Sequence, residues 1–173
     1  VVQSLIDFSA PVIDKLDPQA VNPTLEQAVI LVGAQIQSRG IPLSTLFDPI
    51  KVDVKANKSR LVDLWVNLLL QSRDIAIKHD GNNLLVRSYL SRNGIVVIEF
   101  RIDGAFLPQS LLQDFFEPDF TGPISGFGTG MELTICREIV WQFGGQIAVV
   151  VDEKGTLIRV NLPPARETLQ NAD

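Results

Sequence analysis

The distribution of hydrophobic residues along the chain predicts three amphipathic helices. The strongest covers residues 58–78, where the apolar side chains at helical spacing are Leu61, Leu64, Trp65, Leu68, Leu69, Ile75 and Ala76. A second helix is predicted over residues 24–38, with Thr24 as its N-terminal cap. A third follows a glycine-rich loop and ends at Gly144, and its apolar residues are Met131, Ile135, Ile139 and Phe143, with Cys136 and Val140 beside them. Residues 1–16 begin with a helical pattern that Pro11 interrupts.

Alternating or continuous apolar segments between these helices predict strands. The expected strands cover residues 43–47, 51–55, 84–90, 94–102, 146–151 and 156–162. A hairpin turn is expected at residues 91–94, and the Asp17-Pro18 and Asn22-Pro23 pairs predict a connector. This order of elements predicts the α+β class, as a two-layer α/β sandwich in which helices cover one face of a mixed, mostly antiparallel sheet.

The composition limits the classes of protein to which the chain can belong. With 173 residues, of which 46% are hydrophobic, the chain can fold as one domain. A net charge of -5 disfavours a nucleic-acid-binding protein, which would normally be basic. The single cysteine, Cys136, excludes an internal disulfide framework and is expected to be a small buried hydrophobe. The single histidine, His79, is expected on the surface near a turn.

Signals for secretion or membrane insertion are not recognisable in the sequence. No apolar run is long enough to span a membrane, and no basic segment precedes an apolar core as in a signal peptide. Because the chain begins with Val-Val rather than Met, we expect it to be a part of a longer protein, in which a membrane or sensor segment could lie upstream.

A polar stripe interrupts the predicted helix over residues 58–78. Asp63, Asn67 and Gln71 are spaced by four residues and therefore share one helix face. A carboxylate can orient a hydroxyl or accept a proton, and carboxamide oxygens can ligate Mg²⁺. The stripe therefore predicts a site that holds a hard cation, and the alternative is an ordinary solvent-exposed face.

Two glycine-containing segments are candidates for binding a nucleotide. Asp103 precedes Gly104 at the end of a predicted strand, where its carboxylate could accept a hydrogen bond from an exocyclic amine such as that of adenine. Gly126, Gly128 and Gly130 leave backbone N–H groups open at a predicted helix start, which favours a phosphate. The alternatives are a simple turn after a strand and a turn before a core helix.

These segments, in this order, resemble the catalytic and ATP-binding domain of sensor histidine kinases, within the GHKL ATPases of the Bergerat fold. Residues 63–76 resemble the N box of that family, and residues 102–108 lie at its first glycine box. Residues 115–120 resemble the F box, and residues 126–133 resemble the second glycine box. The resemblance implies binding of ATP with Mg²⁺ and membership of a two-component signalling pathway.

The resemblance also implies roles for single residues. Asp63 takes the general-base position, and Asn67 takes the position of the first N-box asparagine, as a catalytic and cofactor-binding residue. Gln71 stands where the second asparagine would ligate Mg²⁺, so that Asn67 and Gln71 are the expected metal ligands. The remaining expected cofactor-binding residues are Asp103 at adenine with Gly104 beside it, and Gly128, Thr129 and Gly130 at the phosphates.

The chain departs from the family pattern at several of these positions. Gln71 is longer than the expected asparagine, and Ala105, Phe106 and Leu107 replace a flexible glycine-containing loop. Glu132 replaces the next expected glycine, and the lid segment over residues 121–127 contains no Lys or Arg. These motifs are degenerate, so we expect weakened or lost ATP-dependent histidine phosphorylation. The alternative is a pseudokinase module that docks a response regulator or a partner kinase without binding ATP.

The resemblance finally implies an organisation for the chain and its parent protein. Residues 1–20 would be the end of a dimerisation helix with its linker, residues 21–164 the ATPase-like domain, and residues 165–173 a polar tail. The phosphoacceptor histidine would lie upstream of residue 1, and homodimerisation would use upstream helices. We expect a cytoplasmic domain that contacts neither nucleic acid nor membrane.

Overall fold

A five-stranded sheet forms one layer of the domain, and helices form the other. The computed structural model describes residues 15–112 and 130–166. The strands of the large sheet, in spatial order, are β2 (Leu43–Phe47), β4 (Asn83–Leu90), β5 (Val96–Asp103), β7 (Gly155–Leu162) and β6 (Gln146–Asp152). Only β2 and β4 pair in parallel, and the other neighbours are antiparallel. The predicted fold class is therefore confirmed.

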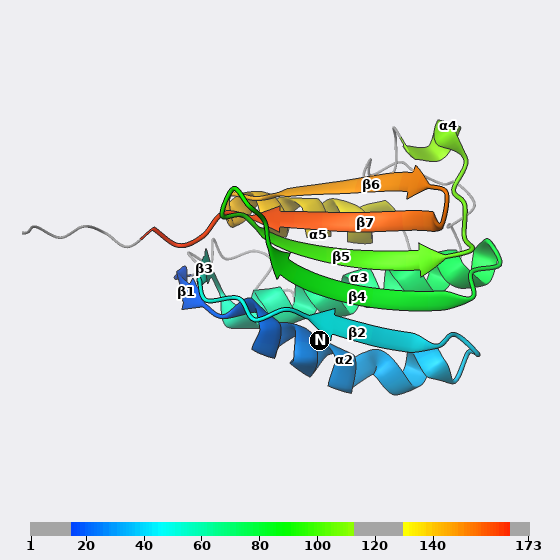
Figure 1. Ribbon diagram of the computed structural model, residues 1–173, viewed down its shortest axis with the longest axis horizontal. Coiled ribbons are helices and arrows are strands. Elements are labelled where there is room, and N and C mark those ends of the chain that lie inside the picture. Colours follow the sequence, from blue (N-terminus) through cyan, green and yellow to red (C-terminus); the bar gives the residue numbers. More distant parts are fainter. Residues whose placement is uncertain (1–14, 113–129, 167–173) are drawn as a thin grey trace, which may run out of the picture.

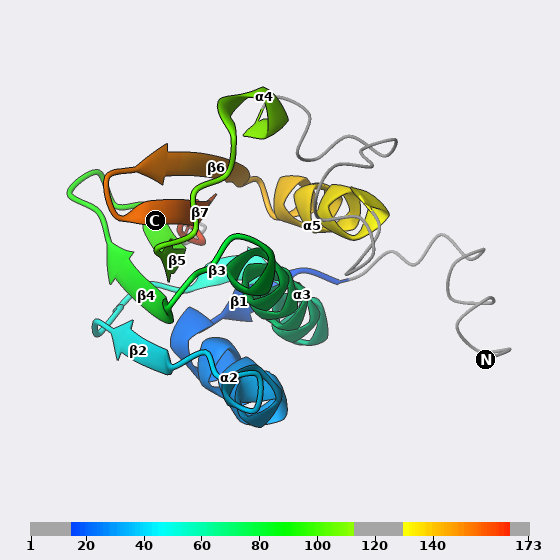
Figure 2. The same ribbon diagram turned by 90° about the vertical axis from the view of Figure 1, so that its right-hand side faces the viewer.

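Three helices pack side by side on one face of this sheet. They are α2 (Val21–Gln37), α3 (Lys58–Lys78) and α5 (Gly130–Gln142). Figure 2 shows all three on the same side of the strands, with α3 in the middle. A four-residue helix, α4 (Gln109–Leu112), follows β5 at one end of the sheet (Figure 1). None of the helices in the described ranges has the length and apolarity needed to cross a bilayer.

The central helix α3 carries most of the contact between the two layers. Trp65 is fully buried, and its ring lies 6.1 Å from that of Phe100 in β5. The indole Nε1 of Trp65 donates to the hydroxyl of Thr24 in α2 at 2.9 Å, and that hydroxyl donates to the carbonyl of Val21 at 2.6 Å. Because each of these polar atoms is paired, the core can bury them without a large penalty.

The start of α2 and the neighbouring short strands differ from the predictions. The helix begins at Val21 and includes Pro23 in its first turn, where a missing N–H is tolerated. Thr24 is therefore not the cap, and the Asn22-Pro23 connector was wrong. The strand predicted over residues 51–55 is β3 (Val54–Ala56), which pairs with an unpredicted strand β1 (Asp17–Gln19). A bridge between Val54 and Pro164 joins β3 to the segment after β7, so that β3 contacts both β1 and this segment.

The helix α5 has the predicted place in the chain and, except at Ile135, the predicted apolar face. Leu133, Cys136, Ile139, Val140 and Phe143 are buried, which confirms the expectation for Cys136. Ile135, which the four-residue pattern placed in the core, is 40% exposed. The rest of the predicted face that the structure describes is in the core, so the departure is confined to Ile135, which lines the gap between α5 and α3.

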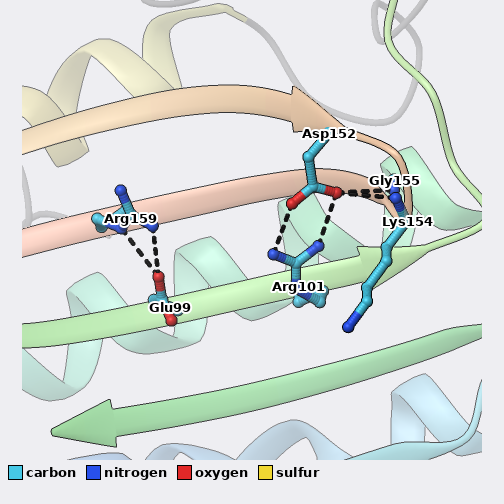
Figure 3. A network of polar contacts seen from close by, with 6 residues as sticks. All are labelled: Glu99, Arg101, Asp152, Lys154, Gly155 and Arg159. Carbon is cyan, nitrogen blue, oxygen red and sulfur yellow. Dashed lines mark hydrogen bonds and ion pairs between the residues drawn. The ribbon is translucent and has the colours of Figure 1, made fainter.

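The sheet face turned away from the helices carries a polar network (Figure 3). Arg101 donates twice to Asp152 at 2.9 and 2.8 Å, and Arg159 pairs with Glu99 at 2.8 Å. Asp152 also accepts from the backbone N–H of Lys154 at 2.9 Å. The hydrogen bonds from Arg101, followed by that from Lys154, hold the pKa of Asp152 well below its usual range. This network fixes the β6–β7 turn, whose Lys154 carbonyl accepts from the N–H of Gly104 at 2.9 Å.

Candidate functional site

A pocket lies between α3 and α5. It has a volume of about 370 Å³ and is lined by Arg60, Asp63, Val66, Asn67, Ile135 and Ile139. The polar part of the lining comes from α3, and the apolar part contributed by α5 includes the exposed Ile135. The structure thus brings the first two residues of the predicted polar stripe to an open cleft between two helices.

The polar stripe enters the protein as it continues along α3. Asp63 is exposed and Asn67 is half-buried, but Gln71 is only 3% exposed. An ordinary solvent-exposed face would keep all three side chains in water, so that alternative is wrong for Gln71. The carboxamide of Gln71 is therefore buried in the protein, and Gln71 is not among the residues that line the pocket.

Asp74 extends the stripe and was missed in the sequence. It follows Gln71 by three residues on the same helix face and is only 2% exposed. Its Oδ1 accepts from Nε and Nη2 of Arg73 at 2.9 and 2.8 Å. Burial raises the pKa of the Asp74 carboxyl, although Arg73 and, more weakly, Arg39 act in the opposite direction. Its spacing from Gln71 was the available signal, but only burial distinguishes it from a solvated acid.

Asp103 lies on the far side of the sheet from α3. Ile98, Phe100 and Ile102 are fully buried, and Phe100 contacts Trp65 of α3. Because side chains alternate along a strand, Asp103 belongs to the opposite face. The pKa of Arg101 on that face is raised by its hydrogen bonds to Asp152 and further by the charges of Asp152, Asp103 and Glu99. The structure therefore does not bring Asp103 together with Asn67 and Gln71.

The carboxylate of Asp103 is held within a regular strand. The residue pairs with Asn83 of β4 and with Gly155 of β7, so it is part of the sheet rather than of a turn. Its Oδ2 accepts from Nδ2 of Asn83 at 3.1 Å, and its Oδ1 is buried without a partner among the described residues. Within the described residues this oxygen is an unpaired acceptor, and it belongs to the sheet face that is turned away from α3.

The segment after β5 is tight rather than open. Gly104 has a φ of +80°, and a Cβ there would lie 2.9 Å from Nδ2 of Asn82, so glycine is required. Ala105 is fully buried and Leu107 is 4% exposed, at positions where the resembling family has a flexible loop. The hydroxyl of Thr156 donates to the Ala105 carbonyl at 2.8 Å and accepts from the Leu107 N–H at 3.3 Å. Two hydrogen bonds from Thr156 thus hold residues 105–107, at the position of the first glycine box, against β7.

Several predicted residues lie outside the part of the chain that the structure describes. Gly128 and Thr129 are among them, as are Gly126, the F-box segment over residues 115–120 and the lid segment over residues 121–127. Gly130 is the first residue of α5, as expected for a glycine loop that enters a helix. The side chain of Glu132 also lies outside the part of the chain that the structure describes.

His79 differs from the prediction of a surface residue. It forms the C-terminal cap of α3, where its backbone N–H donates to the Ile75 carbonyl at 2.9 Å. The side chain is half-buried, and its Nε2 is buried without a partner among the described residues. Burial, with a smaller contribution from the charge of Lys78, lowers the pKa of His79 below its ordinary value. Burial at this helix end therefore disfavours the charged form of the imidazole.

No group of three or more His, Cys, Asp or Glu side chains within the described residues could hold a metal ion. A cation at the α3 stripe would therefore depend on the carboxamide oxygens of Asn67 and Gln71 and on few carboxylates. That donor set is hard and oxygen-rich, which suits Mg²⁺ rather than Zn²⁺.

Comparisons with known proteins relate most of this chain to one family. The family described as the histidine kinase-, DNA gyrase B-, and HSP90-like ATPase matches residues 56–166. The two-component sensor PprA of Pseudomonas aeruginosa is 27% identical over 153 residues, which cover 86% of this chain and 16% of PprA. The sensor histidine kinase ZraS of Salmonella typhi is 28% identical over 164 residues, covering 94% of this chain and 34% of ZraS. The chain therefore spans at most about a third of the length of these relatives.

Solved structures share the fold. The catalytic domain of histidine kinase ThkA matches with a TM-score of 0.70 and 22% identity, over 88% of this chain and 99% of that domain. A solved structure of the mycobacterial sensor histidine kinase MprB matches with a TM-score of 0.69 and 23% identity, over 88% of this chain and 99% of that chain. ThkA in complex with the response regulator protein TrrA matches with a TM-score of 0.71 and 20% identity, over 95% of this chain and 46% of that chain.

Proposed function

Because the chain belongs to the histidine kinase-, DNA gyrase B-, and HSP90-like ATPase family, we propose that it is the ATP-binding and catalytic domain of a two-component sensor histidine kinase in which ATP-dependent phosphorylation is weakened or lost. The observation that carries the proposal is the position of Asp103. Its carboxylate, which the family resemblance assigns to adenine, lies on the sheet face opposite to α3. A base held beside Asn67 and Gln71 would then lack this acceptor.

The tight segment after β5 supports the same conclusion. Nucleotide entry beside a glycine loop requires backbone that can approach the ligand and adjust to it. Ala105 and Leu107 are buried instead, and Thr156 fixes both of their backbone groups. The part of the site that would recognise the base is therefore more altered than the part on α3.

The α3 stripe and the start of α5 keep the means to hold a metal and phosphates. Mg²⁺ would neutralise developing charge on the transferred phosphoryl group when it is bound. Asn67 and Gln71 would offer carboxamide oxygens to it, and the N-terminus of α5 at Gly130, with Gly128 and Thr129 before it, would offer backbone N–H groups to phosphate oxygens. Asp63, at the exposed end of the stripe, would orient or deprotonate an incoming imidazole.

The second candidate function is an interaction module that docks a response regulator or a partner kinase without binding ATP. The segment over residues 105–107 favours this function. It could not move aside for a nucleotide base without breaking its two hydrogen bonds to Thr156. The solved complex of ThkA with the response regulator protein TrrA makes a response regulator the first partner to test. Homodimerisation of the parent protein through upstream helices remains part of both proposals.

Calorimetric titration with ATP and with GTP, each in the presence of Mg²⁺, separates the two functions. A weakened kinase domain binds ATP with an affinity in the high micromolar to millimolar range and discriminates against GTP by less than about threefold, because no carboxylate of β5 faces the pocket. Micromolar ATP binding with a preference of more than about tenfold over GTP would show intact base recognition and refute the weakening. No binding of either nucleotide at millimolar concentration would support the interaction module.

A further inference from the structure

The outer side of α2 presents two large aliphatic side chains to solvent. Ile30 is 81% exposed and Leu31 is 60% exposed, and they are the two most exposed large hydrophobic residues in the described part of the chain. The opposite side of the same helix packs into the core through Leu25, Val32 and Ile36. A helix that is apolar on two sides is typical of a helix with neighbours on both of them. The outer side of α2 therefore has the character of a contact surface.

The charge distribution supports the same interpretation. The chain has a net charge of -5, yet Glu26 is the only charged residue among the 17 residues of α2. Two copies of an acidic protein repel each other, so they approach most easily where acids are sparse. A strongly basic or acidic partner would find only Glu26 to interact with. The other exposed positions of the helix are uncharged, and they are Pro23, Gln27, Ile30, Leu31, Ala34, Gln35 and Gln37.

The order of these residues along α2 is self-complementary. The exposed positions recur every three or four residues, and their spacing is symmetric about the bond between Ile30 and Leu31. When two such helices lie antiparallel across a twofold axis at this bond, Ile30 of one copy faces Leu31 of the second copy. The next facing pairs are Gln27 with Ala34 and Glu26 with Gln35. No acid of α2 faces another acid of α2 in this arrangement, so the apolar centre is not opposed by charge repulsion.

The position of α2 in the helical layer keeps this surface apart from the candidate site. Figure 2 shows α3 in the middle of the layer, with α2 on one side of it and α5 on the other. The pocket that Asn67 lines is formed between α3 and α5. A second copy seated on the outer side of α2 therefore leaves the pocket open.

We infer that the outer side of α2 is an interface for a second copy of this chain, in which two antiparallel α2 helices cross at Ile30 and Leu31 about a twofold axis. The helix is about 25 Å long, and one face of it is smaller than the surface of about 800 Å² per partner that stable interfaces bury. The isolated chain therefore associates weakly. In a parent protein that already holds two copies together, the same contact is strengthened by the high effective concentration. The contact does not require ATP, so it goes beyond the proposed function.

Sedimentation velocity of the chain, from about 10 micromolar to about 1 millimolar, measures this association. The unsubstituted chain should show a reversible monomer–dimer equilibrium with a dissociation constant of about 50 to 500 micromolar. The double variant Ile30→Gln, Leu31→Gln should weaken association by at least about tenfold, because it replaces the apolar centre with polar groups that lose their water. Trp141→Gln is the matched control. It removes a large side chain that is 54% exposed on α5, and the equilibrium should not change.

A pair of introduced charges tests the antiparallel arrangement. Ala34→Glu places a carboxylate opposite Gln27 of the second copy and should weaken association by about fivefold or more. Adding Gln27→Lys to the same chain should restore the dissociation constant to within about twofold of the unsubstituted value, because each new acid then faces a new base of the other copy. The two positions are about 10 Å apart along one helix, so the new charges do not pair within a single copy.

Three results would overturn the inference. They are a monomer at every concentration up to about 1 millimolar, association that persists in the Ile30→Gln, Leu31→Gln variant, and a lack of rescue by Gln27→Lys. Thermal melting checks that the variants are folded, as expected for substitutions at exposed positions. ATP titration of the same variants should give the affinity of the unsubstituted chain. Failure of the dimer and failure of nucleotide binding are thus recorded in separate measurements.

Discussion

Replacing Asp103 with Asn tests the face assignment on which the proposed function depends. The substitution keeps the shape of the side chain and removes its charge. In the structure, Oδ2 accepts from Asn83 at 3.1 Å, and Oδ1 is buried without a partner among the described residues. The amide oxygen of the new side chain would take the Asn83 bond, because the opposite orientation would place two donors against each other.

The expected change in stability is small because two effects oppose each other. The bond from Asn83 changes from a charge-assisted to a neutral one, at a cost of about 1 kcal/mol. Removing the charge from a buried, unpartnered oxygen is worth a similar amount, since a neutral group is cheaper to bury. We expect the free energy of unfolding to stay within about 1 kcal/mol of the unsubstituted value. Urea denaturation followed by tryptophan fluorescence measures it.

The effect of Asp103→Asn on ATP affinity shows whether Asp103 faces the nucleotide. If Asp103 faces away from α3, calorimetry should find that Asp103→Asn changes the dissociation constant by less than about threefold. Asn67→Ala, on the α3 stripe, is the positive control and should weaken binding by about tenfold or more. A loss of more than about tenfold in Asp103→Asn, with stability unchanged, would mean that Asp103 reads the base and that the face assignment is wrong.

Three further predictions concern stability. Gly155→Ala should lower the free energy of unfolding by about 2 kcal/mol or more in urea denaturation, because Gly155 has a φ of +147° and a Cβ there would overlap the Ile102 carbonyl oxygen; a neutral result would contradict this backbone path. Trp65→Phe should cost about 2 to 3 kcal/mol by losing the buried bond to Thr24 and leaving a cavity, whereas Trp141→Phe, at a side chain 54% exposed, should cost less than about 0.5 kcal/mol. The pKa of His79 is lowered in the folded state, so the stability that the neutral side chain contributes is complete above the unfolded pKa of 6.5 and decreases as the pH falls below 6.5. Urea denaturation between pH 7 and pH 5 should show this decrease in the free energy of unfolding. His79→Gln should make the decrease smaller.

The helices could be predicted from the sequence because their signals are local. The apolar face of α3 repeats over 21 residues, so its bounds were predicted correctly. The beginning of α2 could not be, because Pro23 and Thr24 fit both a connector and a first turn. The contact that decides between them comes from Trp65, which is 41 residues away. The prediction that Ile135 is buried was wrong for the same kind of reason. Which side of α5 is buried depends on how the helix packs against α3 and the sheet.

The candidate site was only partly predictable. Helix spacing was enough to place Asp63, Asn67 and Gln71 on one face, but it could not show that the stripe becomes buried at Gln71. Asp74 has the same spacing signal as many solvated acids, and only its 2% exposure distinguishes it. The motif resemblance correctly indicated the family of the chain, because an ordered set of motifs survives many single substitutions.

The sequence by itself determined the periodicity of the helices, the class of the fold and the family, since these depend on residue types at short spacing and on their order along the chain. Only the tertiary structure decided the direction of Asp103. A one-residue change in the register of a strand moves every side chain to the other face. The register of β5 is set by its pairing with β4 and β7, whose partner residues lie 20 or more positions away from Asp103. Burial and strand facing are collective properties of distant segments, and they decide which side chains can meet a ligand.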